Sequence, residues 1–179
     1  YMTTTHPDYS ILAARIAVSN LHKMTLSGME AVFNYLNDVT KNFIQENLEK
    51  INSALKFEND FKYDYFGYKT ISRSYLLRSN ETKDIIERPQ VLLMRIAAAI
   101  HARKKDLDFC LETYEYMSNG YFTHATPTMF NAGTKFQQLA SCFLMTIQND
   151  SIDGIFSTIK DCAMISKSAG GIGLSISNV

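Results

Sequence analysis

Proline and glycine are scarce in this sequence, with 3 Pro and 8 Gly among 179 residues, roughly half of average usage. So few chain breakers favour long elements, and helices over an all-β sandwich with many tight turns. The three cysteines are too few for a disulfide framework and indicate a reducing, cytoplasmic setting. No apolar run approaches the roughly 20 residues of a membrane span, and the basic-then-apolar pattern of a signal peptide is missing. These absences argue against a secreted or membrane protein.

The charges balance, with 18 Lys plus Arg against 18 Asp plus Glu. A net charge of zero provides no general attraction to nucleic acid or to an anionic membrane. One basic run, Arg103, Lys104 and Lys105, falls where a helix should end and suits the helix dipole there. No CxxC pair and no Cys/His spacing suits zinc. The composition therefore predicts a globular protein without metal ligands and without nucleic acid as a partner.

Apolar residues recur at spacings of three and four between Asp8 and Gly133, which predicts a mainly helical region. The stripes are Ile11, Ala14, Val18 and Leu21; Ile44, Leu48, Ile51 and Leu55; Leu92, Ile96 and Ile100; and Leu107, Leu111, Tyr114 and Met117. Pro7 and Pro89 suit the first turns of two of these helices, and Asp106 suits the N-cap of another. We expect a helix beneath each stripe.

The pattern changes at Gln138. The run QLASCFLMTIQ is compact, apolar and bounded by polar residues, as a buried strand is. Asp150 is then well placed to cap a helix. The apolar positions that follow are Ile152, Ile155, Phe156, Ile159 and Ala163 on this helix, and Ile172, Leu174 and Ile176 on a second strand. Strand, helix and strand with short links predict a parallel βαβ unit. We expect a helical region over residues 1–137 and the start of an α/β sheet or barrel over 138–179.

The last strand needs neighbours, because a lone strand cannot satisfy its backbone or bury its faces. We interpret the chain as a fragment of a larger α/β protein. The alternative is that this strand pairs with the apolar run near Phe143. The helix from Ser151 to Ser168 carries more apolar surface than a strand partner needs, so we expect one of its apolar faces to be exposed.

The cysteines differ in their surroundings. Cys142 lies within the predicted strand, where it is either a small buried apolar residue or a thiol that faces a pocket and is available for redox exchange. Cys110 and Cys162 sit on helical stripes and are interpreted as packing residues. We therefore expect no disulfide between Cys142 and either of them.

Two further segments carry polar chemistry. The run AGGIG offers backbone N–H groups that suit a phosphate, although a glycine at a helix C-cap also explains Gly170 or Gly171. Thr126, in the run ATPT, starts a turn or short helix, where its hydroxyl caps either the helix or a ligand oxygen. Neither segment alone identifies a function.

Several long stretches, in order, resemble one family. They are YFTHATPTMFNAGT, QLASCFL and DSIDGIFSTIKDCAMISKSAGGIG, preceded by YMTTTHPDYSILAARIAVSNLHK, DYFGYKTISRSYLL and ERPQVLLMRIAAAIH. The chain resembles the large subunit of class I ribonucleotide reductase of the eukaryotic or viral type. That resemblance implies a dimeric oxidoreductase that converts ribonucleoside diphosphates to deoxyribonucleotides. It also implies a mainly α region leading into the first strands of a ten-stranded α/β barrel.

The resemblance assigns roles to individual positions. Cys142 matches the redox-active catalytic cysteine. The positions that match substrate-binding residues are Thr126, Ser141 and Gly171. The positions that match effector-binding residues are Asp150, Ser151, Ile152 and Lys167.

The resemblance also implies partners. These are a ribonucleoside diphosphate substrate, a deoxynucleoside triphosphate or ATP effector with Mg²⁺, and thioredoxin or glutaredoxin as reductant. A small subunit supplies the radical from its metal site, and this segment itself binds no resident cofactor. The family's radical-bearing cysteine, second redox cysteine, and catalytic Glu and Asn match no position here, so we expect the segment alone to be inactive. The alternative is a nucleotide-effector-binding and dimerisation module without catalysis.

Overall fold

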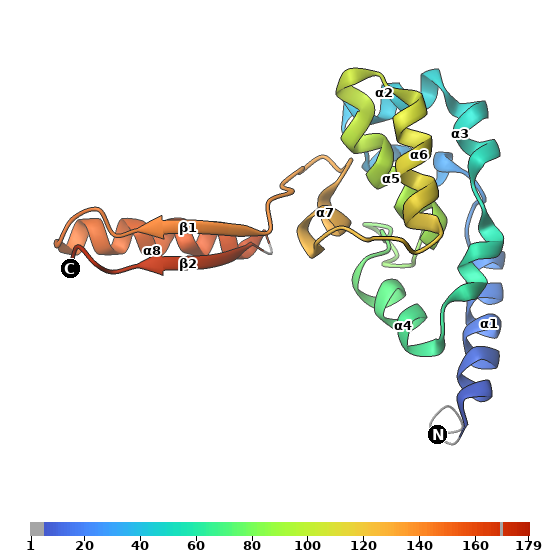
Figure 1. Cartoon of the computed structure of the whole chain (residues 1–179), viewed down its shortest axis with the longest axis horizontal. Coiled ribbons are helices and arrows are strands. Elements are labelled where there is room, and N and C mark those ends of the chain that lie inside the picture. Colours follow the sequence, from blue (N-terminus) through green and yellow to red (C-terminus); the bar gives the residue numbers. More distant parts are fainter. Residues whose placement is uncertain (1–5, 169) are drawn as a thin grey trace. The chain divides into compact units, whose positions relative to one another are not determined.

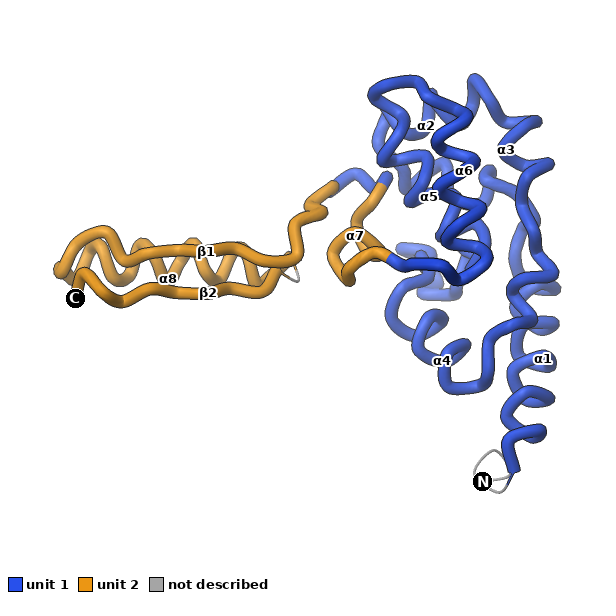
Figure 2. Tube along the Cα trace, in the orientation of Figure 1, with its two compact units in different colours: residues 1–123, 133–136 blue, residues 124–132, 137–179 orange. Residues whose placement is uncertain are grey.

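The computed structural model describes residues 6–168 and 170–179. They form two compact units (Figure 2). Unit 1 takes in the chain up to residue 123 together with 133–136, and unit 2 takes in 124–132 and 137–179. Each unit is described by itself below. The predicted domain boundary after residue 137 stays a prediction.

Unit 1 is helical (Figure 1). Its α-helices are α1 (Pro7–Met24), α2 (Asp38–Glu46), α3 (Leu48–Ala54), α4 (Tyr65–Ser74), α5 (Pro89–His101) and α6 (Leu107–Ser118). Short 3₁₀ turns connect them: η2 (Met29–Tyr35), η3 (Phe57–Lys62) and η4 (Ala102–Lys104).

Helix α5 is the centre of unit 1. Residues Pro89 to Ala99 are all buried, and the helix packs against α6, α2 and the turns η3 and η4. Pro89 occupies the first turn, as predicted, because a proline lacks only an N–H that has no partner there. Leu92 and Ile96 are fully buried, whereas Ile100 lies at the exposed end of its stripe.

Two other predicted helix starts are confirmed. Helix α1 has Pro7 in its first turn and buries Ala14, Val18 and Leu21, although Ile11 is exposed. Helix α6 begins after Asp106, whose Oδ1 accepts a hydrogen bond from the Phe109 N–H at 3.1 Å.

The second predicted stripe does not form one helix. It is divided between α2 and α3 at Asn47, whose backbone leaves the helical region with φ −123° and ψ 19°. The Asn47 side chain donates to the Phe43 carbonyl and its N–H donates to the Ile44 carbonyl, so the residue itself closes α2. Apolar spacing cannot register such a break, because Asn ends helices through its own local hydrogen bonds.

Unit 1 also buries charged groups in pairs. Arg95 and Glu87 are both fully buried, with Arg95 Nε 2.7 Å from Glu87 Oε1. Asp60 lies 2.7 Å from His22 Nε2 and accepts a second bond from the Gln90 N–H. Burial raises the pKa of Asp60, and the bond from His22 partly offsets this. These contacts tie α5 to its neighbours and give the buried side chains of Glu87, Arg95 and Asp60 polar partners in the core.

Unit 2 contains the predicted strand-helix-strand (Figure 1). Its elements are α7 (Thr126–Asn131), β1 (Cys142–Thr146), α8 (Ile152–Lys167) and β2 (Gly171–Ser175). The two strands are parallel, with Cys142 opposite Gly171 and Phe143 opposite Ile172. The pairing of the last strand with the run near Phe143 is therefore confirmed.

Strand β1 is exposed on one face and half-buried on the other, whereas the sequence predicted a buried strand. Its side chains alternate between exposed and half-buried positions, and Leu144 is 94% exposed. The reason is that α8 covers one face of a two-stranded sheet, while no other described element of unit 2 covers the opposite face. In the described part of the chain, no helix is long and apolar enough to cross a membrane.

Candidate functional site

The two faces of β1 carry different chemistry, because side chains alternate along a strand. Phe143 and Met145 point toward α8: the Phe143 ring lies near Ile165 around Gly170, and Met145 Sδ is 3.8 Å from the Cys162 Sγ. Cys142 and Leu144 therefore lie on the open face. The thiol that sequence analysis singled out is exposed, and its interpretation as a buried apolar residue is wrong.

Three predicted site residues meet at the start of the strand pair. The Gly171 N–H donates to the Ser141 carbonyl at 2.7 Å, which sets Gly171 opposite Cys142. A Cβ on Gly171 would lie 3.3 Å from that carbonyl and 4.0 Å from the Cys142 Sγ. The missing side chain thus leaves bare backbone beside an exposed thiol, where a ligand can approach closely.

The three cysteines are all free thiols, so the expected absence of a disulfide is confirmed. Cys110 is fully buried in α6, and burial raises the pKa of its thiol to about 12. Cys162 is half-buried on the side of α8 that meets Met145. Cys142 is the one exposed thiol of the three.

Thr126 is the first residue of α7, and no side chain caps that helix. The helix is held to the segment that leads into β1: Thr128 Oγ1 donates to the Leu139 carbonyl at 3.2 Å, and Asn131 Nδ2 to the Gln138 carbonyl at 2.8 Å. These bonds connect the segment that carries Thr126 to the residues just before Ser141.

The N-cap of α8 is Ser151, not Asp150 as the sequence suggested. Ser151 has extended backbone and its Oγ accepts a hydrogen bond from the Gly154 N–H at 3.0 Å. Asp150 lies one residue too early, because the helix begins at Ile152. Asp150, Ser151 and Ile152 are all exposed, so this helix start is accessible to a ligand.

Lys167 lies at the other end of the same helix. With a rise of about 1.5 Å per residue, it is roughly 22 Å from Ile152. One chain therefore does not bring Lys167 to the other three predicted effector residues.

Helix α8 has two apolar faces, as expected. Ile155, Thr158, Cys162 and Ile165 form the half-buried or buried face. Ile152, Phe156 and Ile159 form a second stripe and are 74%, 63% and 49% exposed. We call these three residues the outer stripe of α8.

Neither Gly170 nor Gly171 is the C-cap residue of α8, contrary to one interpretation above, although the Gly170 N–H closes the helix end by donating to the Ile165 carbonyl at 3.3 Å. The C-cap of α8 is Ser168. Among the described glycines, those with positive φ are Gly120 and Gly133, so neither Gly170 nor Gly171 adopts the left-handed conformation of a cap.

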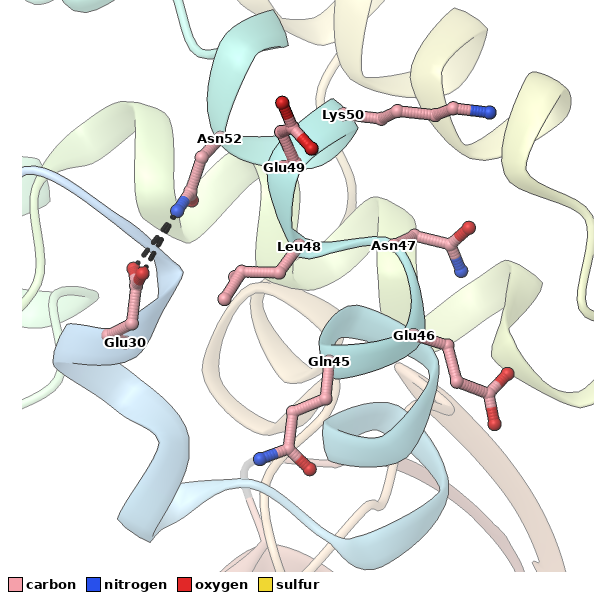
Figure 3. A pocket seen from close by; sticks show the side chains of 8 residues that line it. All are labelled: Glu30, Gln45, Glu46, Asn47, Leu48, Glu49, Lys50 and Asn52. Carbon is pink, nitrogen blue, oxygen red and sulfur yellow. Dashed lines mark hydrogen bonds between the residues drawn. The ribbon is translucent and has the colours of Figure 1, made fainter.

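Sequence reasoning missed a groove of about 690 Å³ in unit 1 (Figure 3). It is lined by Glu30, Gln45, Glu46, Asn47, Leu48, Glu49, Lys50 and Asn52. Its carboxylates do not converge: Glu30 accepts hydrogen bonds from Asn52, while Glu46 and Glu49 point in different directions. In the described part of the chain, no group of three or more His, Cys, Asp or Glu residues is arranged to hold a metal ion.

Comparison with known proteins places both units in one family. Residues 61–137 match the model "Ribonucleotide reductase, all-alpha domain", and residues 140–179 match "Ribonucleotide reductase, barrel domain". The expected fold class, a mainly α region leading into the start of an α/β barrel, is thereby confirmed.

Individual relatives agree over almost the whole chain. The ribonucleoside-diphosphate reductase large subunit of Vaccinia virus is 52% identical over 99% of the chain. The large chain 2 of Saccharomyces cerevisiae is 50% identical over 100% of it, and the large subunit of Danio rerio 50% over 98%. The chain spans about a quarter of the length of these curated relatives, at 24%, 22% and 23%. With two consecutive domain models and relatives at this level of identity, the chain belongs to the ribonucleotide reductase large-subunit family.

Proposed function

We propose that this chain is the part of a ribonucleoside-diphosphate reductase large subunit that supplies one of two redox cysteines, Cys142. One observation carries the proposal: the Cys142 thiol is exposed on the open face of β1, directly beside the bare backbone of Gly171. The names of the relatives specify the substrate class, a ribonucleoside diphosphate.

The proposed reaction is a reduction by two thiols. Cys142 and a second cysteine, contributed from outside this chain, give up two electrons and two protons and become a disulfide. The ribose exchanges its 2′-hydroxyl for hydrogen, and the hydroxyl leaves as water. A radical from the metal site of a small subunit starts the reaction, and thioredoxin or glutaredoxin restores the thiols in the cytoplasm. The three free thiols of the chain are consistent with such a reducing setting.

Substrate contacts are proposed on the same face. Ser141 and Gly171 flank the thiol at the start of the strand pair, and Thr126 lies on the helix anchored just before them. Backbone groups and a hydroxyl are suitable donors for the diphosphate.

The effector is proposed to bind at the start of α8. A deoxynucleoside triphosphate or ATP, with Mg²⁺, would meet the exposed first turn of a 16-residue helix, where unpaired N–H groups favour phosphate. Asp150, Ser151 and Ile152 lie there, and Lys167 would have to come from another copy of α8.

Cys142→Ser in the full-length protein tests the redox assignment. Mixed with the small subunit, substrate and dithiothreitol, this variant should form deoxynucleotide only at background level. Cys162→Ser is the matched control and should retain activity, because Cys162 faces Met145 on the other side of the strand. Turnover by Cys142→Ser would contradict the proposal.

A second candidate function is a nucleotide-effector-binding and dimerisation module without catalysis. The exposed outer stripe of α8 favours it, because such a face suits a partner helix. Saturable binding of a deoxynucleoside triphosphate that depends on Asp150, together with no turnover in the full-length protein, would select this alternative.

A further inference from the structure

Gly170 lies at a tight joint between the end of α8 and strand β1. A Cβ on this residue would lie 2.7 Å from Cγ2 of Ile165 and 2.8 Å from Cε2 of Phe143. Ordinary van der Waals contact begins at 3.4 Å, so the nearer atom is about 0.7 Å too close. The joint therefore has no room for even one methyl group.

A glycine is needed at position 170 because the space is too small for a side chain, not because the backbone adopts a conformation that only glycine allows. Gly170 is not among the glycines with positive φ, so an alanine would suffer no conformational strain there. The atoms in the way belong to a β-branched side chain and a stiff aromatic ring, both half-buried between helix and sheet. Neither can turn aside as the end of an exposed leucine can.

The joint is directly connected to the Cys142 site. The Gly170 N–H donates to the Ile165 carbonyl at 3.3 Å, and the next N–H, of Gly171, donates to the Ser141 carbonyl at 2.7 Å. Two consecutive residues thus fasten the start of β2 first to the end of α8 and then to β1. Any displacement at Gly170 moves Gly171 relative to Cys142.

We propose that Gly170, packed between Ile165 and Phe143, is a positioning residue that holds Gly171 in register with the Cys142 thiol. The inference rests on the proposed function. The role that it gives to Gly170 is indirect, because the residue acts through the position of Gly171 and not by touching the thiol or the substrate. A misplacement of about 1 Å is enough to lose on the order of a hundredfold in rate. Close packing at this joint is therefore expected to matter for turnover.

The test compares Gly170→Ala in two backgrounds of the full-length large subunit. One background is wild type. The other is Phe143→Val with Ile165→Leu, which removes the three atoms that the new methyl group would meet, Cγ2 of Ile165 and Cε2 and Cδ2 of Phe143. Amide hydrogen exchange of residues 170–175 is measured by mass spectrometry, and kcat and KM are measured with the small subunit and a ribonucleoside diphosphate.

In the wild-type background, Gly170→Ala should speed exchange of the Gly171 amide and lower kcat by about tenfold or more. In the Phe143→Val, Ile165→Leu background the same substitution should change the exchange rate and kcat by less than about twofold, because the atoms that the methyl group would displace have been removed. Gly173→Ala is the matched control for exchange. Its Cβ would approach the Leu144 side chain at 3.0 Å and the Phe143 carbonyl oxygen at an ordinary contact distance of 4.0 Å, and Leu144 is free to move because it is 94% exposed.

Each result decides between clear alternatives. Unchanged exchange in Gly170→Ala overturns the proposed joint. Faster exchange with unchanged kcat overturns its positioning role, and an equal loss in both backgrounds shows general destabilisation instead. Lack of turnover by the wild-type enzyme contradicts the proposed function itself, and the inference falls with it.

Discussion

The three cysteines show how far the surroundings of a residue decide its chemistry. Cys110, on α6, is fully buried, and Cys162, on α8, faces Met145. Cys142 lies on the open face of β1. Sequence context identified Cys110 and Cys162 as packing residues from their helical stripes. It could not choose between a buried and an accessible Cys142, because alternation along a strand does not say which face another element covers.

We predict that alkylation at pH 8 distinguishes these thiols in the 179-residue chain. Because burial raises the pKa of Cys110 to about 12, only on the order of 1 in 10⁴ of that thiol is ionised at pH 8, and the thiolate is the reactive form. Iodoacetamide should therefore modify Cys142 first. The rate of modification of Cys110 should be lower by a factor of about a hundred or more. Peptide mass spectrometry over time measures the order.

Urea provides the control for this experiment. In the unfolded chain all three thiols should react at similar rates, because burial no longer separates them. Early modification of Cys110 in the folded chain would contradict its burial in α6.

At the scale of elements, apolar spacing located helices well and their ends less well. The stripes near α1, α5 and α6 were correct because one face of each helix packs on the core. The break at Asn47 and the start of α8 depend instead on single side-chain hydrogen bonds to the backbone. Asp150 and Ser151 are both good N-caps, so composition alone could not choose between them.

We predict that Ser151→Ala and Asp150→Ala separate capping from ligand binding. Ser151→Ala removes the acceptor of the Gly154 N–H and should destabilise the first turn of α8 by about 1 kcal/mol. That corresponds to roughly fivefold faster amide exchange in this turn. Asp150→Ala should leave exchange unchanged and weaken effector binding in the full-length protein. Fast exchange in Asp150→Ala would mean that Asp150, not Ser151, supports the helix.

At the scale of the whole molecule, apolar or reactive faces that are exposed in one chain indicate where a partner or substrate is expected to bind. The outer stripe of α8 is apolar and exposed, and the open face of β1 carries the Cys142 thiol. A two-fold pairing of α8 with its copy would cover the stripe, since two-fold interfaces are self-complementary.

Phe156→Glu should weaken dimerisation of the full-length large subunit. Phe156 is the central residue of the outer stripe, and a carboxylate there would have to be buried without a partner. Sedimentation velocity should show a shift from dimer toward monomer. Ser157→Glu is the matched control, because Ser157 is exposed beside the stripe. An unchanged dimer in Phe156→Glu would contradict the interface.

The 179-residue chain, mixed with the small subunit, should reduce no nucleotide. Reduction needs a second thiol within reach of Cys142, since bridgeable cysteines have Cα atoms within about 7 Å. Cys110 is buried in the other unit, and Cys162 lies on the opposite side of β1. The assay is deoxynucleoside diphosphate formation with dithiothreitol as reductant. Product above background would remove the basis for the role of Cys142.

The sequence by itself determined the helical region, the strand-helix-strand and the family, because periodicity and long ordered motifs are local properties of the chain. It also named Ser141, Cys142 and Gly171 as a group through resemblance. Only the tertiary structure decided which face of β1 is open, which residue caps α8, and why Gly170 has no room for a methyl group. Those features depend on atoms brought together from separate elements, and the distances between such atoms are set by packing rather than by spacing along the chain.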